Sequence, residues 1–296
     1  MLLRRALLAT LIATSALAQP APKRVVASFS ILADMIHRIG EDRVAIRALA
    51  GPNQDLHGFE PRPSDLQAVA QARLLVTNGL GLEGWSDRIA KAAGFKGIAV
   101  VASTGVKPLK TAQNHGHAHA HGAFDPHAWQ SIANARLYVA NIRDGLATAD
   151  PARAEAHTAA AARYTAELDA LDAEIRALFA PIPRPRRRVV TSHEAFAYFA
   201  AAYGIDMLAV AGTWRNAEPS ARELAALAAQ VKRQNIRALF LENAGTGTAL
   251  RALANETNVA IGGRLYADAL SEPNGPAGSY IAMMRHNATV IAEALK

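Results

Sequence analysis

Short apolar segments rich in β-branched residues alternate with longer alanine-rich stretches along this chain, and this alternation limits the folds it can adopt. The apolar segments cover residues 24–28, 74–78, 98–102, 188–192, 238–242 and 258–262. Uninterrupted apolar runs such as Leu74-Leu75-Val76 suit strands that are covered on both faces, as parallel sheets require. The alternation therefore predicts an α/β protein in which helices flank parallel strands.

One long helical pattern divides the chain. From Pro151 to Ala180 the sequence is rich in alanine, glutamate and arginine, without an internal glycine or proline, which favours a single helix. About 30 residues at 1.5 Å each make a helix about 45 Å long, and the prolines of residues 181–185 end it. We therefore expect two lobes of parallel β-sheet flanked by helices, joined by one long connecting α-helix. The predicted parts are residues 19–150 for the N-terminal lobe, 151–185 for the connecting helix and turn, and 186–296 for the C-terminal lobe.

The first 18 residues have the pattern of a signal peptide. Arg4 and Arg5 precede a short apolar run that ends in Ala16-Leu17-Ala18, a small-residue cleavage pattern. A membrane-spanning helix needs about 20 apolar residues, so this run is short for an anchor. The chain has no cysteine, and therefore no lipid-bearing cysteine at the cleavage site. We expect residues 1–18 to be removed near Ala18, leaving a periplasmic protein that is not lipid-anchored.

Charge and composition narrow the range of partners. The formal net charge is +7, and Arg4 and Arg5 supply two of these charges. No long basic stripe with interleaved aromatic residues is present, so nucleic acid is not an expected partner. Hydrophobic residues make up 51% of the chain, which is sufficient for the cores of two lobes. We expect a monomer.

Histidines are concentrated in residues 114–122, where four of them alternate with glycine and alanine. This segment has no periodic apolar face, so we expect an exposed loop. Clustered imidazoles suit borderline metals such as zinc or copper. We expect His115, His117, His119 and His121 to capture metal transiently, while a more rigid site holds it tightly.

Three other histidines lie where a rigid ligand is expected. His57 lies in a loop before a predicted helix that begins at Ser64. His127 follows a proline and precedes Trp129, a large apolar anchor, so its ring is expected to be held still. His193 directly follows the predicted strand 188–192, at the end where open α/β sheets bind ligands. Taken alone, each position also suits an ordinary packing histidine.

Carboxylates complete the set of candidates. Asp268 comes shortly after the predicted strand 258–262, again near a carboxyl end, although capping a helix is an ordinary role for such a residue. Glu194 and Glu242 are further candidates. Because Glu194 adjoins His193, a supporting role behind that ligand is an alternative to direct ligation.

Together these blocks resemble one family, the cluster A-I metal-binding receptors, which are zinc and manganese solute-binding proteins of ABC transporters. The matching blocks cover nearly the whole mature chain in the right order. They are residues 55–57 with 63–65, the histidine-rich loop, 125–129, 192–199, and 265–268 with 280–287. The resemblance implies metal binding in a cleft between the lobes, with His57 and His127 from the first lobe and His193 and Asp268 from the second.

The ligand set implied by the resemblance favours zinc. Manganese receptors of this family tend to have a carboxylate where this chain has His193, and they usually lack a long histidine-rich loop. Three imidazoles with one carboxylate suit zinc better than the harder manganese ion. The chain is thus similar to the zinc-specific branch, for which the resemblance implies Zn2+ as the transported ligand. The implied partners are an inner-membrane ABC permease and its ATPase, together with a periplasmic zinc metallochaperone.

Three alternatives stay open. One is a manganese or iron receptor of the same fold. Another is a zinc-dependent hydrolase, because three histidines with an open coordination position can activate water. Asp268 would close that position, however, and no His-Glu-x-x-His motif is present, so we expect no enzymatic activity. The third is a surface adhesin that merely carries zinc.

Overall fold

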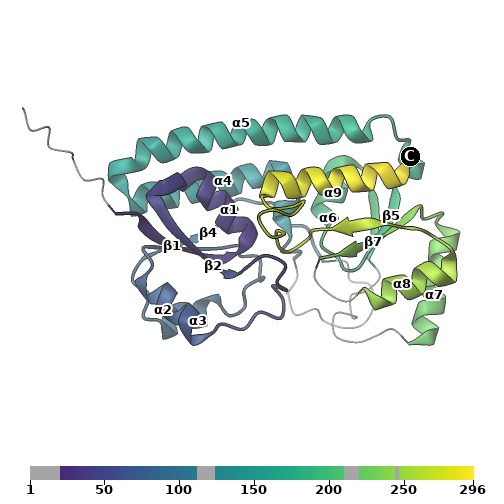
Figure 1. Ribbon diagram of the computed structural model, residues 1–296, viewed down its shortest axis with the longest axis horizontal. Coiled ribbons are helices and arrows are strands. Elements are labelled where there is room, and N and C mark those ends of the chain that lie inside the picture. Colours follow the sequence, from purple (N-terminus) through teal and green to yellow (C-terminus); the bar gives the residue numbers. More distant parts are fainter. Residues whose placement is uncertain (1–20, 112–123, 210–219, 244–246) are drawn as a thin grey trace, which may run out of the picture.

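Two parallel sheets form the framework of the protein (Figure 1). The computed structural model describes residues 21–111, 124–209, 220–243 and 247–296. The first sheet has the order β2-β1-β3-β4 and the second β6-β5-β7-β8, so both lobes share one strand order. The strands are β1 (Lys23–Phe29), β2 (Val44–Ala50), β3 (Leu74–Thr77), β4 (Ile98–Val101), β5 (Arg188–Thr191), β6 (Asp206–Ala209), β7 (Ala238–Glu242) and β8 (Ile261–Leu265). All pairings between them are parallel, which confirms the predicted fold class.

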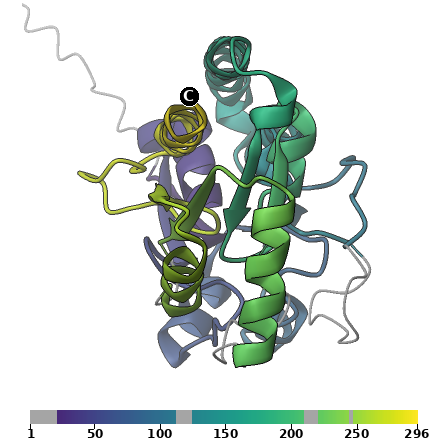
Figure 2. The same ribbon diagram turned by 90° about the vertical axis from the view of Figure 1, so that its right-hand side faces the viewer.

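Helices cover both faces of the sheets. They are α1 (Ser30–Gly40), α2 (Pro63–Gln71), α3 (Ser86–Ala92), α4 (Ile132–Ala149), α5 (Ala154–Phe179), α6 (Ala197–Tyr203), α7 (Ala221–Arg233), α8 (Thr248–Thr257) and α9 (Tyr280–Leu295). Figure 2 shows α5 and α9 end-on at one side of the second lobe, with α7 and α8 at the other. The second sheet is therefore enclosed on both faces, as its apolar strands require.

The helix α5 runs along both lobes and confirms the predicted connector (Figure 1). It has 26 residues, and a 3-10 turn (Pro151–Arg153) precedes it directly. Its buried residues recur every three or four positions along its whole length, which makes one apolar stripe. That stripe packs against α1 and α4 in the first lobe and against α6 and α9 in the second. One hydrophobic cluster consequently continues through both lobes, and it includes Phe29 of β1 and Phe240 of β7.

Two strands were missed by the sequence pattern, and one lies later than predicted. The missed strands, β2 and β6, are the edge strands on one side of each sheet, and they are only partly buried. The strand predicted at 258–262 begins at Ile261, because Asn258 has a φ of 57° and ends α8 in a left-handed conformation. The helix α2 begins at Pro63 rather than Ser64, and the Asp65 carboxylate accepts the Arg62 N–H at 2.9 Å.

Some predictions fall outside this description. The signal peptide (1–18) and the histidine-rich loop (114–122) lie beyond the described residues, and the lobe boundaries 19–150, 151–185 and 186–296 stay predictions.

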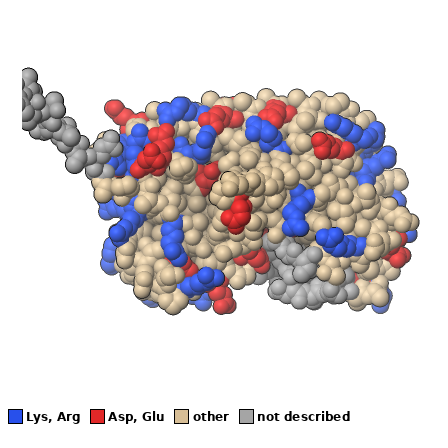
Figure 3. Space-filling model, in the orientation of Figure 1, with Lys and Arg blue, Asp and Glu red and all other residues tan. Residues whose placement is uncertain are grey.

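Within the described ranges, no helix combines the length and the apolar character that crossing a membrane demands. On the face drawn in Figure 3, basic and acidic side chains are interspersed.

Candidate metal centre

The four residues predicted as ligands converge on one point. One ligand atom from each of His57, His127, His193 and Asp268 lies within 4.8 Å of the others. His57 Nε2 lies 3.1 Å from Asp268 Oδ2, and His193 Nε2 lies 3.3 Å from the same oxygen. His127 Nε2 lies 3.4 Å from Asp268 Oδ1. Over the described ranges, this is the one cluster of three or more such residues with the spacing of a metal site.

The ends of parallel strands bring these residues together. His193 follows β5, and Asp268 follows β8, so both leave the carboxyl edge of the second sheet. His57 lies in the loop between β2 and α2 of the first lobe. His127 lies immediately before a one-turn 3-10 helix, η2 (Ala128–Gln130). Trp129 is fully buried with its ring 5.3 Å from the His127 ring, which confirms the predicted apolar anchor.

A carboxylate supports one histidine in each lobe in the same way. Asp125 Oδ1 accepts the backbone N–H of His127 at 2.9 Å and lies 2.7 Å from its Nδ1. Glu242 Oε1 accepts the backbone N–H of His193 at 3.0 Å, while Oε2 contacts its Nδ1. A carboxylate that accepts an Nδ1–H leaves Nε2 to bind a metal ion. Both rings thus present the correct nitrogen to the centre of the cluster.

The register of the second sheet explains the contact between His193 and Glu242. Thr191 of β5 pairs with Phe240 of β7, so two residues further along His193 lies opposite Glu242. Neighbouring strands are separated by about 4.8 Å, which a glutamate side chain can span. The carboxylate is nearly inaccessible, with 2% of its side chain exposed. A buried carboxylate at this position is held by its partner rather than by water.

Opposite charges stabilise one another in the metal-free site. Burial opposes protonation of His193, but the carboxylates of Glu242 and Asp268 outweigh it and raise the pKa of the imidazole to about 10. Burial likewise opposes ionisation of Asp268, yet His193 and His57 hold the pKa of its carboxyl well below the usual range. At neutral pH the His193 ring of the metal-free cluster is therefore protonated on both nitrogens. A divalent cation must displace the proton on Nε2.

The cluster is largely shielded from water, although not uniformly. The exposed side-chain fraction is 1% for Asp268, 4% for His127 and 7% for His57. His193 is the most exposed of the four, at 12%. Screening is weaker in such a site than at the surface, so a doubly charged cation interacts strongly with the buried carboxylate.

Two residues of this arrangement have roles that the sequence pattern does not assign. Glu242 was a candidate without an assigned role, and Asp125 was part of a motif only. Both are buried carboxylates beside a predicted ligand, and Glu242 also ends a fully buried strand, which is the signal that could have identified it. Glu194 does not belong to the cluster.

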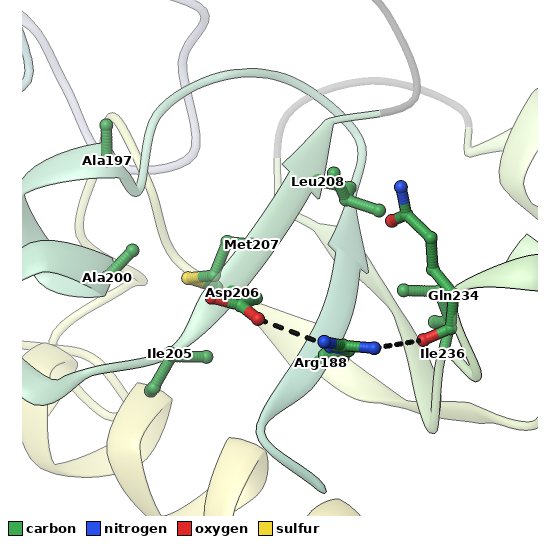
Figure 4. A pocket seen from close by; sticks show the side chains of 9 residues that line it. All are labelled: Arg188, Ala197, Ala200, Ile205, Asp206, Met207, Leu208, Gln234 and Ile236. Atoms are coloured by element: carbon green, nitrogen blue, oxygen red, sulfur yellow. Dashed lines mark hydrogen bonds and ion pairs between the residues drawn. The ribbon is translucent and has the colours of Figure 1, made fainter. Parts of the chain in front are cut away.

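A separate cavity of about 560 Å³ lies at the edge of the second sheet (Figure 4). Its wall includes Met207 and Leu208 of β6 and the ion pair between Arg188 and Asp206. None of the four clustered residues lines it. This cavity is therefore not the metal centre.

Comparisons with known proteins agree with this geometry. A family model described as zinc-uptake complex component A, periplasmic, matches residues 25–294. The manganese-binding lipoprotein MntA of Halalkalibacterium halodurans is 32% identical over 272 residues, which are 92% of this chain and 88% of that protein. The iron-binding protein YfeA of Yersinia pestis is 30% identical over 293 residues, covering 96% of this chain and 92% of that protein.

The fold is also similar to that of solved structures. The periplasmic zinc binding protein TroA from Treponema pallidum matches with a TM-score of 0.84 at 28% identity, over 93% of this chain and 99% of that chain. These three relatives are named for three different metals. The similarity thus establishes a divalent metal receptor, and the choice of ion has to come from the ligands.

Proposed function

The chain belongs to the zinc-uptake complex component A family of periplasmic proteins, and we propose that it is a high-affinity Zn2+ receptor. Membership makes it the metal-binding component of an ABC uptake system, and a solute-binding protein rather than an enzyme. The zinc assignment goes further. It rests on the convergence of three imidazoles and one carboxylate.

We propose that His57, His127 and His193 bind the ion through Nε2 and that Asp268 binds it through a carboxylate oxygen. Four nitrogen and oxygen ligands of this kind suit tetrahedral zinc, for which bonds of about 2.0–2.2 Å are usual. The contacts of 3.1–3.4 Å between the imidazoles and Asp268 are close to the ligand–ligand distances of such a tetrahedron. Manganese prefers more oxygen ligands than this cluster supplies.

The proposal also covers how the receptor collects the ion and to which partners it passes the ion. An ABC permease and its ATPase are the partners that a receptor of an ABC uptake system serves. We propose that the histidine-rich loop (His115, His117, His119 and His121) collects zinc for the cleft, because clustered imidazoles on small spacers bind such ions. A periplasmic zinc metallochaperone is a further proposed partner. With no cysteine to carry a lipid, the proposed receptor is not lipid-anchored.

The names of the relatives support a second candidate, a manganese or iron receptor. Competition distinguishes it from the zinc receptor. Metal-free protein is dialysed against equal concentrations of Zn2+, Mn2+ and Fe2+ without oxygen, and the retained metal is measured by mass spectrometry. We expect about one zinc ion per chain, as one four-ligand site implies. Retention of manganese or iron in preference to zinc would overturn the zinc assignment.

A variant of His193 tests whether this residue selects zinc over manganese. His193→Glu replaces a nitrogen ligand by oxygen, so it should raise the retention of Mn2+ relative to Zn2+. His37→Ala is the matched control, because His37 is exposed on α1 and lies outside the cluster. The control should retain zinc as the unmodified chain does. Equal metal ratios in both variants would show that His193 does not select the ion.

A further inference from the structure

The backbone next to Asp268 is held by the first lobe, although this segment follows β8 of the second sheet. The Ala267 carbonyl accepts hydrogen bonds from Trp129 Nε1 at 2.9 Å and from Gln130 Nε2 at 2.8 Å. Both donors belong to η2, the turn that directly follows His127. The same turn thus adjoins one ligand and bonds to the neighbour of another.

Two more first-lobe groups hold the other side of Asp268. The Leu270 N–H donates to Ser30 Oγ at 3.0 Å, and the Leu270 carbonyl accepts the Asn53 N–H at 2.9 Å. Figure 1 shows the start of α9, just beyond this segment, beside α1 of the first lobe. The Asp268 segment is therefore bonded to the first lobe both before and after the ligand.

His193 is held differently. Its backbone N–H and its Nδ1 both meet Glu242 on β7, and its carbonyl accepts the Thr191 hydroxyl of β5 at 3.0 Å. Apart from the contacts within the cluster, these partners belong to the second sheet. Asn243 of the second lobe also donates to the Ala269 carbonyl at 3.3 Å. A displacement between the lobes that keeps the first-lobe bonds of Ala267 and Leu270 would therefore move His193 relative to Asp268.

Gln130 also has an unusual environment for a residue that serves stability alone. It is fully buried, and its Oε1 has no hydrogen-bond partner among the residues that the structure describes, while its Nε2 donates to the Ala267 carbonyl. An unsatisfied buried oxygen lowers the stability of the fold, and an apolar side chain of the same size would avoid this loss. We therefore attribute the presence of an amide at this position to the hydrogen bond that Gln130 Nε2 donates to the Ala267 carbonyl.

We propose that Trp129 and Gln130 are positioning residues that hold Asp268 on the first lobe, so that three ligands form a pre-assembled half-site. The half-site binds the ion first, and His193 then completes the coordination from the second lobe. Because three fixed ligands need no ordering on binding, this arrangement favours capture. The inference rests on the proposed function, since it requires these residues to bind metal. The half-site consists of His57, His127 and Asp268.

Cobalt titration tests the order of the ligands. Co2+ reports its coordination by visible absorption, and it is added to the metal-free chain and to two variants. We expect His193→Ala to retain one weaker Co2+ site, with the half-site and water as ligands, and Asp268→Ala to lose much more affinity. Equal losses would overturn the half-site. Failure of the unmodified chain to bind Co2+ or Zn2+ would instead overturn the proposed function.

A second pair of variants tests the positioning role. Gln130→Met preserves the side-chain volume and removes the hydrogen bond to the Ala267 carbonyl. We expect it to weaken Co2+ binding by about 10- to 100-fold and to shift the absorption bands. Asn141→Leu is the matched control, because Asn141 donates to the carbonyls of Ala102 and Thr104, which lie outside the cluster. An unchanged spectrum and affinity in Gln130→Met, with lowered stability in both variants, would show that Gln130 has only a structural role.

A third test uses the unmodified chain, so it does not depend on whether a variant folds. Amide exchange is compared between the metal-free and the Zn2+-loaded protein by mass spectrometry. We expect zinc to slow exchange in residues 192–196 and to leave the amides of Leu270 and Asn53 protected in both states, because the Leu270 N–H donates to Ser30 and the Asn53 N–H donates to the Leu270 carbonyl. Strong metal-dependent exchange of these two amides would overturn the inference.

Discussion

Replacing Glu242 with glutamine changes one buried oxygen beside His193 into an amide nitrogen and removes a negative charge. In the native chain, one oxygen accepts the His193 N–H at 3.0 Å and the other contacts Nδ1. Glutamine can satisfy only one of these donors, because its second terminal atom is itself a donor. If the amide N–H faces Nδ1, the ring proton moves to Nε2, which is the nitrogen that the metal requires.

The expected loss of zinc affinity follows from this change. Removing such a support for a ligating histidine weakens metal binding by about 10- to 100-fold, or about 1.4–2.7 kcal/mol. Without the Glu242 charge, the pKa of His193 in the metal-free protein should also fall, because burial then opposes protonation with less compensation. Zinc affinity should consequently depend less steeply on pH in Glu242→Gln than in the unmodified chain.

Competition with a chromogenic chelator, repeated at several pH values, measures both effects. Glu194→Gln is the matched control, because Glu194 adjoins His193 in sequence but lies outside the cluster. The control should bind zinc as the unmodified chain does. Zinc affinity within about twofold of the unmodified chain for Glu242→Gln, far below the loss expected for a supporting carboxylate, would refute the role assigned to Glu242.

The remaining predictions concern the protons of the metal site and the stability of the core. Zinc binding at pH 7–8 should release about one proton, because the pKa of His193 is raised to about 10 in the metal-free chain, and calorimetry in buffers of different ionisation enthalpy checks this. The raised pKa of His193 also stabilises the metal-free fold. This stabilisation is complete below the unfolded-state pKa of about 6.5 and is lost as the pH rises through 10. A melting temperature of the metal-free protein that does not fall between pH 7 and pH 10 would contradict this prediction. Leu168→Ala, on the fully buried stripe of α5, should lower the free energy of unfolding by about 2–5 kcal/mol in urea. Because one apolar cluster continues through both lobes, unfolding should remain a single transition, and two separate transitions would contradict that reasoning.

Much of the fold was predictable because it depends on local pattern. The strand β7 matches its predicted range 238–242, and α5 occupies the predicted helical stretch, since apolar runs and alanine-rich segments act through neighbouring residues. The edge strands β2 and β6 escaped prediction because Arg47 interrupts the apolar residues of β2 and because β6 contains no β-branched residue. Their strand character comes from pairing with β1 and β5.

By itself, the sequence predicted His193 and Asp268 near strand ends, because local periodicity predicts the strands, and its resemblance to one family implied the full set of four ligands. Only the tertiary structure decided which groups support them. Glu242 meets His193 through the order and register of β5 and β7, which bring residues 49 positions apart into contact. Trp129 meets the Ala267 carbonyl across 138 positions, through packing of one lobe against the other. Such contacts depend on how distant segments are placed, and no local pattern encodes that placement.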